Sequence, residues 1–230
     1  MDRSESIIER TVAVIPAYNA ARHLAAVIDD VSVHIARERI IVVDDGSADD
    51  SHAVAKGAGA LALQHEVNQG KGAALRTGIV HAGKIGCGFA ITLDADGQHN
   101  PADIPKFIGR WVETGADIIV GNRMSEVADM PWIRLATNRT TSWVVSRLAG
   151  ASIPDSQNGY RMISTELFAR IELETTRYDT ESEILIKAGR LGAKIASVGV
   201  ETIYGDEESS INPFVDSARF FRMVVRSFFW

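Results

Sequence analysis

Residues 40–47 read IIVVDDGS, and residues 89–96 read FAITLDAD. In both stretches an apolar run passes directly into acidic residues. Such a run is typical of a strand that is buried on both faces of a parallel sheet, and the acidic residues then follow the end of that strand. Because open α/β sheets bind ligands beyond the carboxyl ends of their strands, these stretches predict both the fold class and the functional edge.

The rest of the chain alternates short apolar runs with helical patterns in the same way. This alternation predicts an α/β fold with a mainly parallel central sheet flanked by helices. We expect one large domain over residues 1–212 and an amphipathic C-terminal helix over 213–230. Further strands are expected at 11–16, 60–64, 117–120 and 194–200, and an apolar stretch at 159–163 and helices at 24–35, 50–57, 72–82, 100–111 and 181–191 complete the domain.

Composition excludes several classes of protein. The chain has 230 residues, of which 46% are apolar and 23% are charged, and its formal net charge is −6. This charge argues against a protein that binds nucleic acid by attraction to phosphates. The single cysteine, Cys87, excludes an intramolecular disulfide and a cysteine-based zinc cluster. No apolar run approaches the ~20 residues that span a bilayer, and the first ten residues are too polar for a secretory signal. We therefore expect a cytoplasmic protein.

Asp94 and Asp96 are the first candidates for chemistry. In an extended chain alternate side chains share one face and lie about 7 Å apart, so two carboxylates can hold one cation between them. Oxygen ligands favour Mg²⁺ or Mn²⁺, and such ions usually also bind substrate phosphates. The pair therefore predicts a divalent metal site, with a solvated turn as the alternative that these two residues leave open.

Further motifs follow one another in register along the chain. Together they resemble the family-2 glycosyltransferases, which are nucleotide-diphospho-sugar enzymes with the GT-A fold. Within that family they are most similar to the dolichol- or polyprenyl-phosphate mannose and glucose synthases. The resemblance covers roughly residues 11–212 and consists of IPAYN at 15–19, IVVDDGS at 41–47, NQGKG at 68–72, DADGQH at 94–99, GNR at 121–123, DSQNGYR at 155–161 and ESEIL at 181–185.

The resemblance implies a role for each matching residue. The metal on the donor diphosphate would be held by Asp94 and Asp96, with Gln98 as a third contact. Arg123 and Arg161 would face phosphates and complete the catalytic set. Lys71, at a helix start that suits anions, would lie beside the donor. The remaining donor contacts would be Pro16, Ala17, Tyr18, Asp44, Asp45 and Ala95.

Taken without the resemblance, the same residues also fit structural roles. Asp44 can simply form a tight turn, Lys71 can be an exposed side chain at a helix start, and each arginine can form a surface ion pair. His99 is a further possible ligand, although a loop histidine without a second ligand more often has no such role.

The implied reaction is the inverting transfer of a hexose from a UDP- or GDP-sugar to a polyprenyl phosphate. A phosphate monoester is already anionic at pH 7 and needs no general base. A hydroxyl acceptor would need one, and the candidates are Asp155, Glu181 and Glu183. Hydroxyl-directed relatives often carry a Glu-Asp pair where this chain has Glu181-Ser182-Glu183, which favours the phosphate.

Two other functions remain as alternatives. A sugar-1-phosphate nucleotidyltransferase would carry a glycine-rich loop after the first strand, where this chain has PAYN at 16–19. A non-catalytic nucleotide-sugar-binding protein is supported only by two departures from the family pattern. Ala20 follows Asn19 where the family usually has Glu, and Glu208 lies where relatives commonly carry a lysine.

Two segments predict a peripheral membrane contact. Residues 128–150 combine two tryptophans with three arginines, and a helix pair that packs on the sheet is the alternative. On a C-terminal helix, one face would carry Arg219, Arg222 and Arg226 and the opposite face Phe214, Phe221, Val224, Val225 and Phe228. A basic amphipathic helix binds membrane surfaces, although docking onto its own domain or a second subunit fits equally well. The apolar ending at Trp230 leaves open a continuation into a membrane segment.

Overall fold

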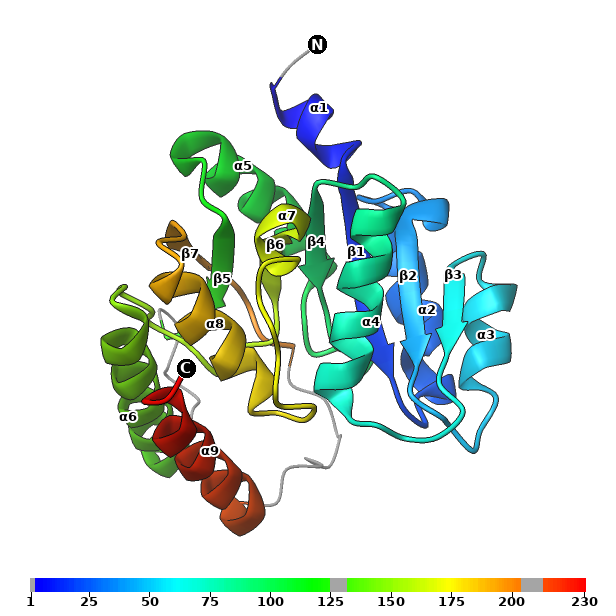
Figure 1. The fold of residues 1–230 in the computed structure, drawn as a ribbon. Coiled ribbons are helices and arrows are strands. Elements are labelled where there is room, and N and C mark those ends of the chain that lie inside the picture. The colour runs from blue at the N-terminus through cyan, green and yellow to red at the C-terminus, as the bar shows by residue number, and fades with distance from the viewer. Residues whose placement is uncertain (1–2, 125–131, 204–212) are drawn as a thin grey trace.

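The computed structural model describes residues 3–124, 132–203 and 213–230, and Figure 1 shows the chain as a ribbon. Its described part forms a seven-stranded sheet in the order β3-β2-β1-β4-β6-β5-β7. Only β6 runs antiparallel to its two neighbours, β4 and β5. The expected α/β fold with a mainly parallel sheet is therefore confirmed. The strands are β1 (Thr11–Ala17), β2 (Ile40–Asp44), β3 (Leu61–Gln64), β4 (Phe89–Thr92), β5 (Ile118–Asn122), β6 (Arg161–Ser164) and β7 (Ile195–Gly199).

Helices cover both faces of the sheet (Figure 1). In β1, Ala13 and Ile15 face one buried apolar cluster while Val12 and Val14 face the other, as expected for a strand with both faces covered. The first cluster packs under α1 (Arg3–Ile8), α2 (Ala21–Ser32), α3 (Ser51–Gly57) and α5 (Ile104–Thr114). The second packs under α4 (Lys71–Lys84), α6 (Trp132–Ala149), α7 (Thr165–Phe168), α8 (Thr180–Arg190) and α9 (Pro213–Ser227). Short 3₁₀ turns, η1 (Arg37–Arg39) and η2 (Pro101–Asp103), precede β2 and α5.

The carboxyl ends of the parallel strands β1, β2 and β3 meet at the lower edge of the sheet in Figure 1, where α4 begins. The loops at this edge are bonded to one another. Asn19 N–H donates to Ser47 Oγ (2.9 Å), and Asn19 Oδ1 accepts from Ala48 N–H (2.9 Å). Asn19 has a φ of 51°, a conformation that asparagine tolerates better than most residues. The loops after β1 and β2 therefore form one connected surface.

The C-terminal helix does not have the two faces expected from the sequence. Met223 and Ser227 are buried, and Phe220 and Val224 pack against the second apolar cluster. Arg190 of α8 donates to the Ser227 carbonyl. Phe221, Val225 and Phe228 stay exposed and form an exposed apolar stripe. The buried and packed residues of α9 form a separate docking stripe, and Arg222 and Arg226 are exposed. Val224 belongs to the docking stripe, and the side chain of Phe214 lies outside the described residues.

Of the segment 128–150, the described residues 132–150 contain one helix, α6, and not the helix pair considered from the sequence. Residues 128–131, the side chains of 132–134 and Glu208 lie outside the described residues. None of the helices in the described ranges combines the length and the apolar character needed to cross a bilayer.

Candidate functional site

Lys71, Asp94 and Glu181 come together from three segments that are far apart in the sequence. Lys71 is the first residue of α4, Asp94 follows β4, and Glu181 lies in the first turn of α8. The Lys71 Nζ atom lies 2.7 Å from Asp94 Oδ1 and 3.0 Å from Glu181 Oε1. The side chain of Lys71 is only 20% exposed, so it is not the solvent-exposed lysine that the sequence left as an alternative.

The electrostatics of this cluster keep it charged. Burial alone would lower the pKa of Lys71, but the carboxylates of Asp94 and Glu181 outweigh burial and hold it well above its usual range. Burial would likewise raise the pKa of Asp94, and the Lys71 ammonium instead lowers it to about 2. Lys71 and Asp94 therefore stabilise each other's charged form.

Glycines allow the segments around Lys71 to approach one another. A Cβ atom on Gly159 would lie 2.8 Å from Glu181 Oε1 and 3.1 Å from Lys71 Nζ, so backbone forms one wall of the cluster. A Cβ atom on Gly72 would lie 2.0 Å from Thr180 Oγ1. Because the bare backbone is needed at both positions, the start of α4 packs directly against the start of α8.

Asp96 and Gln98 form a tight turn beyond Asp94. Asp96 Oδ1 accepts from Gln98 N–H at 3.0 Å, and Gly97 between them has a φ of 75°. The backbone N–H of Asp94 donates to His99 Nδ1 at 3.0 Å, which places the His99 proton on Nε2. His99 is partly buried, and this burial lowers its pKa. His99 therefore positions the backbone of Asp94.

The donor set at this turn fits a divalent cation. Asp94, Asp96 and Gln98 offer carboxylate and amide oxygens, the atoms that Mg²⁺ and Mn²⁺ prefer. Within residues 3–124, 132–203 and 213–230, no group of three His, Cys, Asp or Glu side chains could hold a metal ion. Two carboxylates together with substrate phosphates are the usual arrangement for Mg²⁺, so these residues suit an ion that arrives with a phosphate ligand.

Arg123 is paired with Asp155 in a two-pronged contact. Its Nε and Nη2 atoms lie 2.8 Å and 3.0 Å from Asp155 Oδ2 and Oδ1. The side chain of Asp155 is 0% exposed while that of Arg123 is 16% exposed. Asp155 thus fixes the guanidinium, which is close enough to Asp94 to contribute to lowering its pKa. The pair is more buried than the surface ion pair considered from the sequence.

Arg161, which the resemblance places facing a phosphate, has a buried side chain in this structure. The side chain is 1% exposed, and its guanidinium donates to the backbone carbonyls of Ser156, Asn158 and Glu181. All three of its nitrogen atoms are therefore engaged within the protein. Arg161 ties the segment before β6 to the start of α8.

Asp45 and Asp44 are almost fully buried and hold the loops around them. Asp45 accepts from the N–H groups of Gln69 (3.0 Å) and Gly70 (2.7 Å), which fixes the turn before Lys71. Asp44 accepts from Ser47 N–H (3.0 Å) and so forms the turn considered from the sequence. Both carboxylates therefore fix the conformation of the loops that form the expected donor site.

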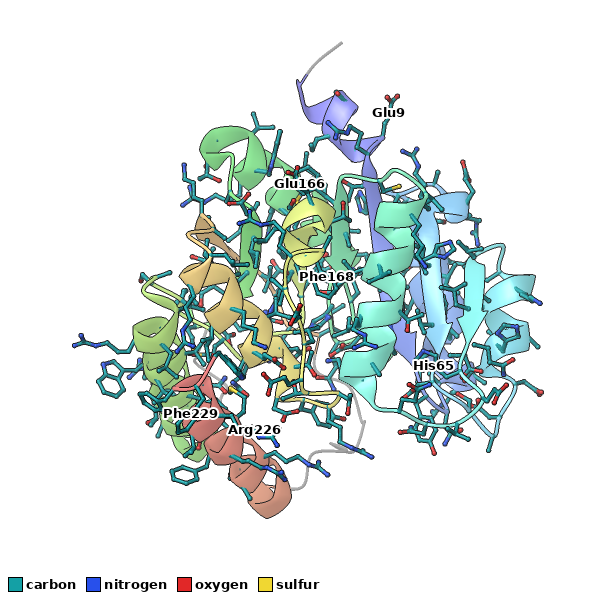
Figure 2. The ribbon with its side chains drawn as sticks, viewed as in Figure 1. Glu9, His65, Glu166, Phe168, Arg226 and Phe229 are labelled. Carbon is teal, nitrogen blue, oxygen red and sulfur yellow. The ribbon has the colours of Figure 1, made fainter. Side chains whose placement is uncertain are left out.

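His65 is a residue of this network that sequence reasoning missed. Its Nδ1 lies 2.7 Å from Asp45 Oδ1, and its Nε2 lies 2.9 Å from Thr77 Oγ1 on α4. Figure 2 labels His65 in the loop after β3. Its place directly after a predicted strand, like those of Asp44 and Asp94, is the signal that could have found it.

The other expected donor residues line the edge mainly through their backbone. The side chains of Pro16, Ala17 and Ala95 are buried, whereas Tyr18 is 53% exposed at the rim. Small buried side chains leave the backbone groups of strand ends near the surface. Of these four residues, only Tyr18 offers a side chain to a ligand.

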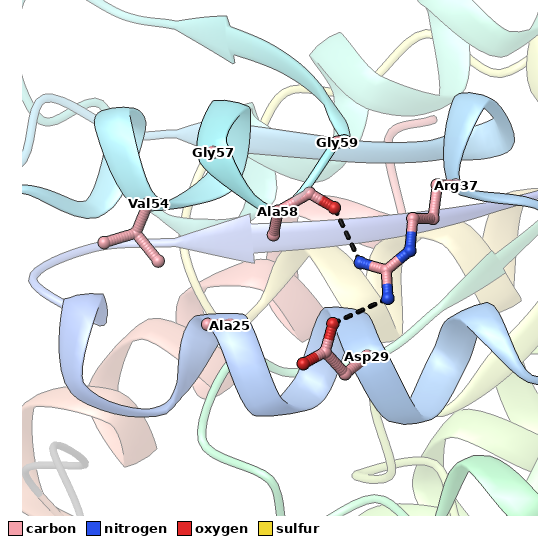
Figure 3. A pocket seen from close by; sticks show the side chains of 7 residues that line it. All are labelled: Ala25, Asp29, Arg37, Val54, Gly57, Ala58 and Gly59. Atoms are coloured by element: carbon pink, nitrogen blue, oxygen red, sulfur yellow. Dashed lines mark hydrogen bonds and ion pairs between the residues drawn. The ribbon is translucent and has the colours of Figure 1, made fainter.

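A groove of about 550 Å³ lies between α2 and α3, away from this cluster. Figure 3 shows its ion pair, in which Arg37 donates to Asp29 Oδ1 (2.8 Å) and to the Ala58 carbonyl (2.7 Å). Arg37 precedes β2 and Gly59 precedes β3, so the groove lies at the amino ends of these strands. We therefore place the functional site at the opposite edge.

The chain is similar to proteins of a known family. The family model described as Glycosyl transferase family 2 matches residues 12–172. The chain is 33% identical over 213 residues to UDP-N-acetylglucosamine–dolichyl-phosphate N-acetylglucosaminyltransferase of Methanococcus voltae, covering 83% of this chain and 84% of that protein. It is 32% identical over 175 residues to polyprenol monophosphomannose synthase of Mycolicibacterium smegmatis, covering 72% and 65%.

The fold also matches a solved structure. Glucosyl-3-phosphoglycerate synthase from Mycobacterium tuberculosis, in complex with Mn²⁺, UDP and glucosyl-3-phosphoglycerate, has a TM-score of 0.68 at 21% identity. The match covers 98% of this chain and 82% of that one. This likeness confirms the GT-A fold.

The pKa of Asp94 predicts an acid-dependent loss of stability. Because the folded-state pKa of about 2 lies below the usual 3.8, the contribution of Asp94 is complete above pH 5 and is lost as the pH falls toward 2. Between pH 6 and pH 3 this loss amounts to roughly 1 kcal/mol. Urea denaturation at pH 6 and at pH 3 measures how much the free energy of unfolding falls between these two values. This fall should be smaller in Asp94→Asn than in wild type by that amount. Asp29→Asn, which removes an exposed ion pair, is the control and should leave the fall unchanged. An identical fall in wild type and Asp94→Asn would contradict the assignment.

Proposed function

The chain belongs to glycosyl transferase family 2, and we propose that it transfers a hexose-type sugar from a UDP- or GDP-sugar to a polyprenyl phosphate. The reaction inverts the configuration at the anomeric carbon and uses Mg²⁺ or Mn²⁺. The names of the relatives from M. voltae and M. smegmatis, a dolichyl-phosphate sugar transferase and a polyprenol monophosphomannose synthase, support this acceptor class.

The choice of a phosphate acceptor rests on one observation. Each of the three carboxylates considered as general bases is already in contact with a cationic side chain. Asp155 is held by Arg123, and Glu181 is held by Lys71. Glu183 is fully buried and accepts from Lys187 Nζ (2.8 Å) and Thr175 Oγ1 (2.6 Å), as well as from two backbone N–H groups. A cation paired with a carboxylate stabilises its ionised form and so makes it a weaker base toward a hydroxyl acceptor.

An anionic phosphate acceptor removes this requirement. One of its oxygens attacks the anomeric carbon, a new carbon–oxygen bond forms, and the bond between that carbon and the diphosphate of the donor breaks. No proton has to be removed from the acceptor, and the nucleoside diphosphate leaves with the electron pair. The protein has to hold two anions close together, and Lys71 and Arg123 supply positive charge for this purpose.

The donor would lie along the edge formed by the loops after β1, β2 and β4. Asp94, Asp96 and Gln98 would hold the divalent ion, which when bound stabilises the negative charge of the departing nucleoside diphosphate. The exposed Tyr18 and the backbone around Ala17 and Ala95 would contact the nucleoside. Asp45 and His65 would act by fixing the loop that leads to Lys71.

Matched acceptors test this proposal. We expect purified protein with Mn²⁺ and UDP- or GDP-sugars to glycosylate a polyprenyl phosphate but not the polyprenol of the same length, because only the phosphate is already ionised. Asp96→Asn should lower transfer at least about 100-fold, since a lost metal contact removes charge stabilisation from the transition state. Asp29→Asn, in the exposed groove at the opposite edge of the sheet, is the matched control. Equal transfer to polyprenol, or full activity of Asp96→Asn, would refute the proposal.

We also propose that α9 and α6 hold the protein against the membrane that contains the acceptor. Both helices pack on α8, through Ala149 against Gly189 and through Ser227 against Arg190. Phe228 is 71% exposed and Phe229 is 85% exposed. Figure 2 labels Phe229 and Arg226, both near the end of α9.

Two further features of these helices support a lipid surface as the partner. On α9 the exposed Arg222 and Arg226 lie beside the exposed apolar stripe of Phe221, Val225 and Phe228, as in helices that bind anionic membranes. On α6, Trp143 is 62% exposed and the Arg147 guanidinium lies 5.8 Å from its ring centroid. Both helices thus present aromatic and cationic groups together, and aromatic side chains favour membrane interfaces.

Vesicle co-sedimentation tests this contact. The double variant Phe228→Ser/Phe229→Ser should bind vesicles that contain anionic lipid at least about tenfold more weakly than wild type, because two exposed aromatic side chains no longer enter the interface. Val33→Ser removes an exposed apolar side chain from another surface and should have no effect. Equal binding of the double variant and wild type would contradict the proposed contact.

A further inference from the structure

Lys71 occupies a position at which a cation is electrostatically disfavoured. It is the first residue of α4, and the start of a helix carries a partial positive charge that favours anions. The side chain is also largely withdrawn from water, at 20% exposure. An ammonium group remains there because Asp94 and Glu181 both contact it. The contacts with these two carboxylates therefore stabilise the positive charge of Lys71 at this position.

The contact with Asp94 involves the carboxylate that would hold the divalent ion. The shorter of the two contacts of Lys71, 2.7 Å, is to Asp94 Oδ1. A metal ion bound at Asp94 would share this carboxylate with the ammonium group, which already takes one of its lone-pair positions. An ammonium group and a divalent cation on one carboxylate would also repel each other strongly, because the site is partly buried.

We propose that the Lys71 ammonium is a built-in counter-cation of Asp94, which the divalent ion must displace, so that metal and nucleoside diphosphate bind cooperatively. This inference rests on the proposed function, because it concerns the donor site of that reaction. It assigns Lys71 a second task besides contact with the donor, namely to keep the acidic edge neutralised and to weaken the binding of metal alone.

The structure supplies a place for the displaced ammonium. Glu181 Oε1 already lies 3.0 Å from Nζ, so Lys71 can leave Asp94 without losing its second carboxylate. Gly159 presents bare backbone next to all three charged groups, so no side chain stands between Lys71, Asp94 and Glu181. A diphosphate adds further negative charge beside the start of α4, where backbone N–H groups favour anions. Nucleotide binding thus favours the same movement of the Lys71 ammonium away from Asp94 that metal binding requires. Each of the two ligands should therefore strengthen the binding of the other by the same factor.

Calorimetric titration with MnCl₂, in the absence of any sugar transfer, tests the proposal. Lys71→Met should bind Mn²⁺ alone at least about fivefold more tightly than wild type, because no ammonium has to be displaced. It should also lose most of the enhancement of Mn²⁺ affinity that UDP or GDP produces in wild type. Lys84→Met, an exposed lysine in the last turn of the same helix, should match wild type in both titrations.

Three further variants make the result specific. Lys71→Arg keeps the charge and should keep the weak binding of Mn²⁺ alone. Lys71→Gln should behave like Lys71→Met, and it provides the same test if the methionine variant does not fold. In the Lys71→Met background, adding Asp94→Asn should abolish the gain in affinity, which would locate the gained site at Asp94.

The outcomes separate this inference from the proposed function. If wild type binds Mn²⁺ with UDP or GDP but both neutral variants bind Mn²⁺ alone no more tightly than wild type, the counter-cation role is wrong and the proposed function stands. If Mn²⁺ and either nucleotide fail to bind wild type together, the metal-dependent donor site itself is refuted, and this inference falls with it.

Discussion

Three distant segments of the chain meet at the ammonium group of Lys71. Asp94 contacts it from the end of β4 and Glu181 from the start of α8, while Gly159 provides a backbone wall. The ammonium prevents the two carboxylates from repelling each other and joins α4 to the opposite side of the site. Without it, two partly buried negative charges would face each other where a diphosphate has to bind, so the organisation of the site depends on this contact.

The surrounding residues fix this cluster rather than act on a substrate themselves. Asp45 and His65 hold the turn that delivers Lys71, and Arg161 ties the start of α8 to the segment before β6. Asp155 fixes the guanidinium of Arg123. Because the carboxylates near the site are committed to such pairs, the site supplies positive charge more readily than a free base. That balance suits a reaction between two phosphate-bearing molecules.

The sequence predicts most of the sheet because the strands other than β6 are mainly apolar runs that end at polar residues, whereas β6 begins with the buried Arg161. It also predicts that Asp44, Asp94 and Lys71 lie at one edge, since strand ends and helix starts converge there in an α/β fold. It could not show which of these side chains are already engaged. Arg161 matches a family motif yet is buried against carbonyl groups, and no local pattern distinguishes it from Arg123. The faces of α9 likewise depend on where Met223 and Ser227 dock, which periodicity alone does not determine.

The central claim is that Asp94 and Asp96 hold a divalent ion on the diphosphate of an activated sugar while Lys71 moves aside. A crystal structure of the protein with Mn²⁺ and UDP or GDP, with anomalous scattering used to locate manganese, tests it most directly. The account predicts an anomalous peak in contact with both carboxylates and a Lys71 ammonium that no longer contacts Asp94 but still contacts Glu181. A bound nucleotide without manganese at these carboxylates, or with the Lys71–Asp94 contact intact beside the metal, would contradict it.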